Sequence, residues 1–523
     1  MKRLTVLLVL IISFNSLAQK KQIEVKVTRS AIFKERSKWH FKSILEAKDN
    51  SFFTIRTQLT GLLSAKPVYL FNKFDHEYNK ISSYKYKPKK NHSLAAAAVT
   101  EKSFYFIEYK RDKKRKKIIA FMNVSSLDEF NFEKKEIFSL DVEKFPGFLD
   151  SFFSGTKMDT NLDGNLSFSE DGNYLVFNID SYSKKHEQHS IIVLDKNLNE
   201  LWRKDFKLEI EDNRFELEGI KVSNSGDVFV LGKAYPKRKA KTKKDKRDYH
   251  YQLIKINATT TNSLDLSVED HFVGSLNLTF TNTNKIGCLG FYSDRSDFRY
   301  KGISSFFINP DDLSIESKNF SPFTNQFLAD KYGKVKNKEL RNVVLRDVYY
   351  SDNGEVTFTA EEFYIKVVYA NFGLYGAGVR RNIYNFDDIM VIKTDNLGKL
   401  KWARNINKRQ SSGIFSDPLL SFASIINNSG DVFLFLNAHK NMGEMSGNRL
   451  KFRQGWLSGV TKKNSHMYVV KFDNKGDWNF KTIQENKNAS TIINSRFMQV
   501  LDESKLVFYG SHKNNKQFIT LTF

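Results

Sequence analysis

The segment Asp159–Glu170 places oxygen-bearing side chains at a spacing that suits a metal ion. Its first, third, fifth, ninth and twelfth positions are Asp159, Asn161, Asp163, Ser167 and Glu170. Gly164 follows at the sixth position, where a residue without a side chain permits a sharp turn. Carboxylate, amide and hydroxyl oxygens are the ligands that Ca²⁺ prefers, so the segment is a candidate calcium site.

This spacing resembles the calcium-binding loop of EF-hand proteins, with one departure and one competing interpretation. Leu162 stands where those loops usually have a polar residue. The stretch Leu166–Ser169 is also typical of a strand, with Ser169–Gly172 as its turn. An extended strand would carry Glu170 away from the other ligands. Both interpretations stay open: a calcium site, or a polar loop that leads into a strand.

Other residues with catalytic potential form no recognised motif. His186 and His189 share a metal only if their loop bends suitably, and the chain has no His-Glu-x-x-His, Gly-x-Ser-x-Gly or phosphate-binding Gly-Lys-Ser/Thr motif. The acidic pairs Glu361–Glu362 and Asp387–Asp388 could serve acid–base chemistry, but sequence does not give the distance between carboxylates. Cys288 is the single cysteine, which excludes an internal disulfide and a Cys-based metal site. We therefore expect no enzymatic activity, and these acidic pairs remain unassigned.

A recurring hairpin must position whatever site the chain has. Ile425–Leu436 combines a strand, the turn Asn-Ser-Gly-Asp and a second apolar strand, and related hairpins stand at Phe168–Phe177, Val222–Val230 and Tyr350–Phe358. A single hairpin cannot bury its own apolar face, so repetition over hundreds of residues indicates a radial β architecture.

We predict an all-β protein in which residues 19–523 form one β-propeller of four-stranded blades. Eight blades are the best count, and seven remain the alternative because the first two repeats are degenerate. The predicted second strands are Ser51–Arg56, Ser103–Tyr109, Asn173–Ile179, Asp227–Lys233, Lys285–Tyr292, Glu355–Glu362, Asp431–Ala438 and Lys505–Gly510. The predicted third strands are Pro67–Phe71, Ile118–Asn123, Ser190–Asp195, Tyr251–Asn257, Lys301–Asn309, Asp388–Thr394, Met467–Asp473 and Gln517–Thr522. The alternating segment Gln22–Thr28 is expected to close the last blade.

The connections between third and fourth strands carry a second motif. Leu194–Trp202, Thr394–Trp402 and Phe472–Trp478 each combine an Asp, a turn-forming Gly or Asn, and a Trp. This motif resembles the repeat of quinoprotein-like propellers, which include quinone-dependent dehydrogenases and a non-catalytic scaffold of outer-membrane protein assembly. The dehydrogenases typically carry adjacent cysteines, which this chain lacks. The resemblance therefore favours the scaffold branch, and a calcium-dependent quinoprotein is the weaker alternative.

The first residues are typical of a secretory signal peptide. Lys2 and Arg3 precede an apolar run to Phe14, and cleavage is expected after Ala18, so residues 1–18 would be removed. No Cys follows that position to carry a lipid, and no later apolar run is long enough to span a bilayer. We expect a periplasmic or secreted protein.

Positive charge gathers in one class of loop. In a propeller, the connections between second and third strands (b–c) and between blades (d–a) emerge on one face, and the other turns emerge on the opposite face. The net charge is +24, and long b–c segments hold basic runs at 110–117 and 237–247. The b–c loops at 371–381 and 449–457 add aromatic residues and arginines. Residues chosen as candidates for partner binding are Lys113, Arg115, Lys237, Arg238, Lys243, Tyr375, Arg380, Arg381, Arg449, Phe452, Arg453 and Trp456.

Such a face can steer an acidic partner. Each basic run is equally explained as a solvated loop that keeps the protein soluble, and each aromatic loop as a segment folded onto its own propeller. Two short amphipathic helices are also expected, one over Phe145–Phe153 and one within Pro322–Asp330.

These observations favour a non-enzymatic interaction module, acting as a monomeric propeller within a hetero-complex. Its expected partner is the acidic protein surface of an outer-membrane-associated assembly or export complex, with anionic lipid or polysaccharide as other anionic partners. Nucleic acid is not expected because of the leader and the lack of a recognition motif. The alternative is an extracellular propeller that binds or cleaves glycans. No cofactor is expected apart from the candidate Ca²⁺.

Overall fold

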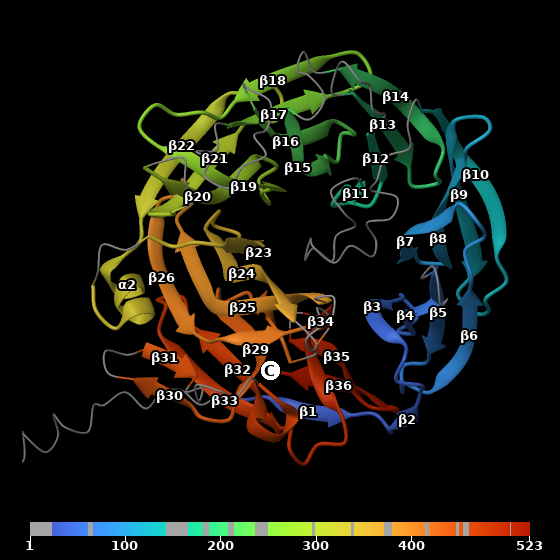
Figure 1. The fold of residues 1–523 in the computed structure, drawn as a ribbon. Coiled ribbons are helices and arrows are strands. Elements are labelled where there is room, and N and C mark those ends of the chain that lie inside the picture. Colours follow the sequence, from blue (N-terminus) through green and yellow to red (C-terminus); the bar gives the residue numbers. More distant parts are fainter. Residues whose placement is uncertain are drawn as a thin grey trace, which may run out of the picture.

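The computed structural model describes residues 23–60, 66–142, 166–180, 188–207, 214–235, 249–294, 299–335, 339–370, 379–413, 417, 419–445, 449–452, 460–502 and 504–523. These residues form eight sheets, which stand in a ring around a central axis (Figure 1). The predicted all-β fold, a single β-propeller with four-stranded blades, is confirmed.

The first four blades are simple antiparallel meanders. Blade 1 contains β3 (His40–Glu46), β4 (Phe52–Thr60), β5 (Lys66–Phe74) and β6 (Lys80–Tyr86). Blade 2 contains β7 (His92–Val99), β8 (Ser103–Asp112), β9 (Lys117–Ser126) and β10 (Glu133–Asp141). Blade 3 contains β11 (Leu166–Phe168), β12 (Tyr174–Asp180), β13 (Gln188–Asp195) and β14 (Glu200–Lys207). Blade 4 contains β15 (Phe215–Val222), β16 (Val228–Ala234), β17 (His250–Ile256) and β18 (Thr261–Asp265).

Blade 5 is also a four-stranded meander, and additions begin with blade 6. Blade 5 contains β19 (Phe272–Phe280), β20 (Ile286–Ser293), β21 (Gly302–Ile308) and β22 (Ile315–Pro322). Blade 6 contains β23 (Val343–Tyr350), β24 (Val356–Ala370), β25 (Val379–Thr394) and β26 (Leu400–Asn407), extended by β27 (Gln410–Ser412), β30 (Met442–Met445) and β31 (Arg449–Phe452). Blade 7 contains β28 (Phe422–Ile426), β29 (Val432–His439), β32 (Ser465–Phe472) and β33 (Trp478–Glu485), with a 3₁₀ turn at Lys462–Asn464. Blade 8 contains β34 (Ile492–Asp502), β35 (Lys505–His512) and β36 (Asn515–Thr522), completed by β1 (Lys26–Arg29) and β2 (Phe33–Lys34).

The first strand of each blade lies nearest the axis and the fourth at the rim (Figure 1). All eight predicted second strands and all eight predicted third strands overlap strands of the structure. Strands in these positions are apolar along their length because both faces of the sheet are covered by neighbouring blades. β20, β21 and β29 are buried at every residue, whereas the rim strand β22 is mostly exposed or half-buried.

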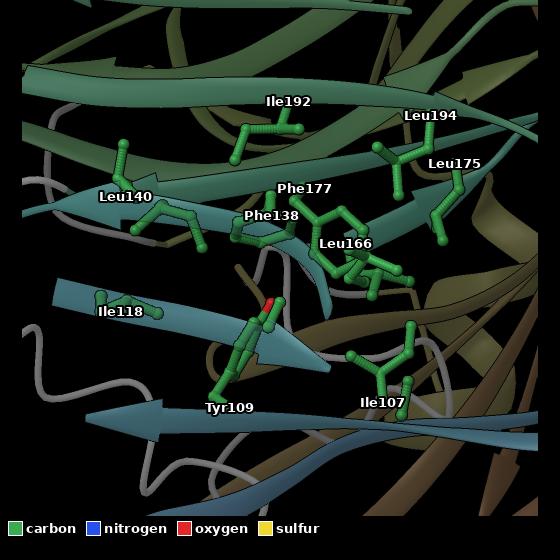
Figure 2. Close-up of a cluster of buried hydrophobic side chains, with 14 of the residues drawn as sticks. Ile107, Tyr109, Ile118, Phe138, Leu140, Leu166, Leu175, Phe177, Ile192 and Leu194 are labelled. Carbon is green, nitrogen blue, oxygen red and sulfur yellow. The ribbon is translucent and has the colours of Figure 1, made fainter. Parts of the chain in front are cut away.

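The core consists of apolar layers between neighbouring blades. Figure 2 shows the layer between blades 2 and 3, where side chains from β8, β9 and β10 meet those from β11, β12 and β13. Phe138 and Phe177 pack edge to face with ring centroids 5.0 Å apart, and the ring of Tyr109 lies 6.4 Å from that of Phe177. Aromatic side chains fill these layers well because flat rings bury a large area between two sheets.

The Asp-Gly-Trp motif joins one blade to the next. The Trp402 Nε1 at the start of the rim strand of blade 6 donates a hydrogen bond of 3.0 Å to the carbonyl of Asn474, which lies in a turn of blade 7. Gly476 in that turn has a φ of 85°, and a Cβ there would lie 2.9 Å from the Trp402 ring. The motif is therefore a blade-to-blade contact.

The N-terminal strand closes the ring, as the alternating segment Gln22–Thr28 predicted. β1 pairs with β36 in antiparallel register, with Lys26 opposite Thr522 and Arg29 opposite Ile519. Just after β2, Glu35 forms an ion pair with Arg56 of blade 1, whose side chain is fully buried. Closure thus combines strand pairing with a buried charge contact between blades 8 and 1.

The helix expected within Pro322–Asp330 is present slightly later, as α2 (Asn325–Tyr332). The Thr324 hydroxyl accepts a hydrogen bond of 3.1 Å from the Phe327 N–H, which caps the first turn. The helix expected over Phe145–Phe153 lies outside the described residues. Within the described part of the chain, no helix is long and apolar enough to cross a membrane.

Replacing Glu35 by Gln should destabilise the closed ring. The substitution leaves the buried guanidinium of Arg56 without its carboxylate, which typically costs about 3–5 kcal/mol. Urea unfolding followed by circular dichroism measures this loss. Glu101→Gln is the matched control, because Glu101 pairs with Lys48 on the surface, where both side chains are more than half exposed, so no measurable change is expected. Equal losses in the two variants would mean that the buried pair does not stabilise closure.

Replacing Gly476 by Ala tests the blade-to-blade contact. Both Gly476 and Gly172 have a positive φ, which costs a residue with a Cβ about 1–2 kcal/mol. A Cβ at Gly172 would meet nothing within 4 Å, so Gly172→Ala measures the backbone cost alone. Gly476→Ala should cost more, because the Trp402 ring must also move. Urea unfolding measures the free energy of unfolding of both variants. A smaller loss for Gly476→Ala than for Gly172→Ala would contradict a close blade-to-blade contact at Gly476.

Candidate functional site

The basic run 110–117 forms a tight hairpin rather than a long loop. β8 ends at Asp112 and β9 begins at Lys117, so only Lys113–Lys116 make the turn, and all four side chains are exposed. The Asp112 carboxylate accepts a hydrogen bond of 3.1 Å from the Arg115 N–H, which lowers the pKa of Asp112 below its usual value. The predicted residues Lys113 and Arg115 therefore stand at a defined turn.

A second basic segment lies beside this hairpin. The connection from β6 to β7 runs through residues 87–91, and the Arg111 N–H donates a hydrogen bond of 2.9 Å to the Asn91 carbonyl. We define the basic patch as seven exposed side chains from the two segments: Lys87, Lys89, Lys90, Lys113, Lys114, Arg115 and Lys116. The patch lies on the face of the b–c and d–a connections, which we call the loop face.

A buried carboxylate holds the base of the patch. Glu108 on β8 is bonded by the Tyr86 hydroxyl and the Lys134 ammonium, and the His92 Nδ1 lies 2.6 Å from its Oε1. Burial alone would raise the pKa of Glu108, but the bonds from Lys134, Tyr86 and His92 outweigh it and the pKa is lowered. These bonds tie β6, β7, β8 and β10 together beneath the exposed cations.

The opposite face, which we call the turn face, is built from acidic turns. In four third-to-fourth-strand turns an Asp carboxylate accepts two backbone N–H groups at 2.7–3.0 Å; these residues are Asp75, Asp195, Asp395 and Asp473. An Asp at this position is a common way to close a tight turn. The same turn chemistry that shapes one face therefore leaves carboxylates there, opposite the basic patch.

Two of the predicted partner-binding residues are used inside the molecule. The Arg449 Nε donates a hydrogen bond of 2.7 Å to the Asp330 carbonyl at the end of α2, and a terminal nitrogen of Arg449 donates one of 2.7 Å to Asn407. Phe452 is 3% exposed and lies in the apolar layer between blades 6 and 7. The β30–β31 hairpin, which carries both residues, pairs in parallel with β26 and so straps blade 7 to blade 6.

The remaining predicted residues are only partly placed. Outside the described residues lie Lys237, Arg238, Lys243, Tyr375, Arg453 and Trp456, together with the candidate calcium ligands Asp159, Asn161 and Asp163. Arg380 and Arg381 lie on β25 and pair with Tyr369 and Val368 on β24. Both belong to the long b–c hairpin of blade 6.

Two of the five predicted calcium ligands are described. Ser167 is buried on β11, where it pairs with Val176, and Glu170 is exposed in the following turn. The stretch Leu166–Phe168 is thus a strand, as the competing interpretation proposed. Among the described residues, no group of three or more His, Cys, Asp and Glu side chains is placed to hold a metal. Calcium binding stays a prediction.

The structure also brings together a charged cluster that the sequence did not reveal. A register shift in the β24–β25 ladder sets the two acidic pairs side by side. The Glu361 carboxylate accepts hydrogen bonds of 2.6 Å from the Lys408 ammonium and 2.7 Å from the Ser421 hydroxyl, and forms an ion pair with Arg346. We call Arg346, Glu361, Asp387, Lys408, Ser421 and Arg496 the inner-rim cluster. Its members come from blades 6 and 8 and from the connection between blades 6 and 7.

Burial governs the ionisation of this cluster. Glu361 and Lys408 have fully buried side chains. Burial raises the pKa of a carboxyl, but Lys408 and Arg346 reverse this for Glu361, whose pKa is lowered. Burial also lowers the pKa of Lys408, and burial with the nearby Arg346 lowers that of Arg496 to about 10. The cluster therefore holds compensating buried charges, which fix the connection that follows β26.

The neighbouring acidic residues have different partners. Lys331 of α2 lies 2.7 Å from Glu362 and 2.8 Å from Asp388, so these carboxylates hold the helix. The Tyr364 hydroxyl donates a hydrogen bond of 3.0 Å to Asp387, whose pKa is raised by burial. In the sequence, only the two acidic pairs pointed to this cluster. The residues that they contact lie far away in the sequence, so the contacts could not be predicted.

Comparisons with known proteins give only distant likenesses to solved structures. No family model and no curated protein matches the chain. Among solved structures, the β-propeller domain of the trilobed protease from Pyrococcus furiosus is 8% identical, with 87% of this chain and 99% of that chain covered and a TM-score of 0.37. Prolyl oligopeptidase B from Galerina marginata is 8% identical, with 91% and 56% covered and a TM-score of 0.38. Polysaccharide lyase Uly1 is 10% identical, with 96% and 94% covered and a TM-score of 0.33.

At such identities and TM-scores, these proteins carry no argument about activity. The likeness to quinoprotein-like propellers, and to their scaffold branch, stays a prediction based on the Asp-Gly-Trp motif.

Replacing Glu361 by Gln should strongly destabilise the propeller at neutral pH. The change leaves the buried Lys408 without its carboxylate, a loss of about 3–5 kcal/mol. Because the folded-state pKa of Glu361 lies below its usual 4.5, its contribution is present above pH 4.5 and is lost as the pH falls through the folded value. The difference in the free energy of unfolding between the native chain and the variant, measured with urea, should therefore become smaller in acid. A double variant, Glu361→Met with Lys408→Met, should recover part of the loss, and a constant difference across pH would contradict this account.

Proposed function

We propose that the protein is a non-enzymatic interaction module that docks through the basic patch onto the acidic surface of a partner protein. We propose that the protein is periplasmic or secreted and that its partner belongs to an outer-membrane-associated assembly or export complex. The exposed basic patch, supported on a rigid base, is the observation that carries this proposal.

The electrostatics of the patch suit partner capture. Seven cations project from two adjacent connections, and the one acidic side chain of the hairpin turn, Asp112, accepts the Arg115 N–H. Clustered charge of one sign raises the rate at which an oppositely charged surface is met, and orients it before contact. The acidic turns on the turn face strengthen this orientation, because they repel the same partner.

The support of the patch also matters for docking. Long lysine side chains lose conformational freedom when they bind, so a backbone that is already fixed reduces the total cost of association. The Glu108 bonds and the Arg111–Asn91 hydrogen bond provide such a fixed backbone. This fixed backbone supports a docking role for the 110–117 run, beside the alternative of a solvated segment that serves solubility alone.

Neutralising the patch should reduce partner capture without unfolding the protein. A variant with Lys113, Lys114 and Lys116 replaced by Ser removes three charges from the exposed turn but leaves Asp112 and Arg115 in place. Association should slow by about tenfold or more at low salt, and this difference should vanish at high salt, where charges are screened. Site-specific photocrosslinking from position 115 in intact envelopes identifies the partner, and its purified form then serves in the kinetic measurement.

A photoreactive residue at position 312 is the matched control. Asp312 lies in a turn of blade 5 on the turn face and is exposed. Adducts with an acidic protein from position 115, but not from position 312, support the proposal. Equal adducts from both positions, or capture that the triple substitution does not change, would overturn it.

A further inference from the structure

The long β24–β25 hairpin extends beyond blade 6. β23 pairs with β24 only up to Glu362, and β26 pairs with β25 only from Ile389 onward. Residues 363–370 and 379–386 therefore pair with each other past the end of the blade, apart from β27, which joins at Tyr384–Phe386. We call these two segments the arm. It is a b–c hairpin, so it leaves the ring on the loop face.

The arm carries positive charge and no carboxylate. From Phe363 to Phe386 the sequence contains no Asp or Glu, and its charged residues are Lys366, Arg380 and Arg381. Such a segment is attracted to negative charge and contains no side chain that repels it.

One side of the arm exposes apolar side chains to water. Ile365 is 36% exposed and Val367 is 40% exposed, and both are among the large apolar side chains that the surface displays. Tyr384 lies directly opposite Ile365 in the ladder, and residues directly opposite share a face of the sheet. Lys366 lies between the two apolar residues and occupies the other face.

The root of the arm is fixed, so these side chains are held away from the core. The Phe363 and Phe386 rings pack with centroids 4.9 Å apart, and the Tyr364 hydroxyl bonds to Asp387. The Lys408 ammonium of the inner-rim cluster donates a hydrogen bond of 3.0 Å to the Phe386 carbonyl. The buried charges described above therefore support the base of the arm.

We propose that the arm seats the loop face on an anionic lipid surface, with Ile365 and Val367 in the apolar boundary and Lys366 among the headgroups. An apolar side chain that enters the boundary of a bilayer, next to cations that meet anionic headgroups, is the general chemistry of peripheral membrane attachment. Tyrosine suits this depth because its ring is apolar and its hydroxyl is polar.

The separation of the arm from the basic patch favours a lipid surface over a second site on the same partner protein. Blades 2 and 6 stand four sheets apart in a ring of eight, on opposite sides of the axis (Figure 1). The hairpin of blade 2 and the arm of blade 6 both leave the ring on the loop face. A flat anionic lipid surface can meet the arm while the partner protein of the proposed function occupies the basic patch, whereas one protein would need two matching sites at that separation.

Flotation of the purified full-length chain with vesicles tests this inference. The probes are vesicles of phosphatidylcholine alone and of phosphatidylcholine mixed with phosphatidylglycerol. The native chain should float with the mixed vesicles and not with the neutral ones. Replacing Ile365 and Val367 together by Glu should reduce the partition coefficient by about tenfold or more, because it removes apolar contact and adds repulsion.

Leu397→Glu is the matched control, since Leu397 is 58% exposed in a turn on the turn face, and it should leave flotation unchanged. A milder pair, Ile365→Thr with Val367→Thr, keeps strand propensity and should reduce flotation in the same direction. Thermal unfolding of each variant confirms that the fold persists.

The outcomes separate this inference from the proposed function. Loss of flotation in the arm variants, with partner crosslinking from position 115 retained, supports a lipid contact. Absent flotation of the native chain, or flotation that survives both arm variants, overturns it. If the arm variants abolish protein crosslinking while the native chain binds no vesicle, the arm contacts a protein and the lipid inference is wrong, whereas the proposed function stands.

Discussion

Each sheet of the ring is covered on both faces, and this single packing constraint shapes most of the molecule. Strands in the second and third positions must be apolar on both sides, which explains why β20, β21 and β29 are buried throughout. It also explains the inter-blade contacts between Trp402 and Gly476, because two sheets can pack closely only where their turns fit. A stack that needs a neighbour on both sides has no natural end, so the chain must close it on itself.

Buried charges recur at the loop-face end of the blades. The inner strands shift register between Phe41 and Ser43, between Leu94 and Ala96, and between Leu345 and Val348. Opposite or next to these shifts, the second strands carry Arg56, Glu108 and Glu361. A bulge opens the ladder and re-aims side chains, which gives a charged group space for several partners. The loop-face ends of these three blades therefore rest on buried ion pairs.

The sequence predicted the strands and the closure well because both depend on local pattern. The turn and the apolar periodicity of the hairpin at Ile425–Leu436 are present in its own sequence and do not depend on neighbouring blades. The charged cluster around Glu361 could not be predicted in the same way, since Lys408 and Ser421 reach it only after the ring has formed. Arg449 and Phe452 illustrate the same limit. Their residue types suit an interface with a partner, but the β30–β31 hairpin folds back, so α2 and blade 7 are the surfaces that they contact.

The two proposals use different parts of one face for different purposes. The basic patch on blade 2 is polar, exposed and rigid, which suits selection among charged partners. The arm on blade 6 exposes apolar side chains, which suits a contact that removes apolar surface from water. Because the two stand across the ring from each other, a ligand engaged by both would fix the tilt of the propeller as well as its position.

The pairing of β1 with β36 also has a consequence in time. β1 precedes the strands of blades 1 to 7 in the chain and β36 follows them, so β1 can pair with β36 only after those blades have been synthesised. Until then, the ion pair of Glu35 with Arg56 between blades 8 and 1 is not formed. The sheets at the two ends of the unclosed ring also have open edges. The formation of β36 thus decides when the ring of the preceding blades can close.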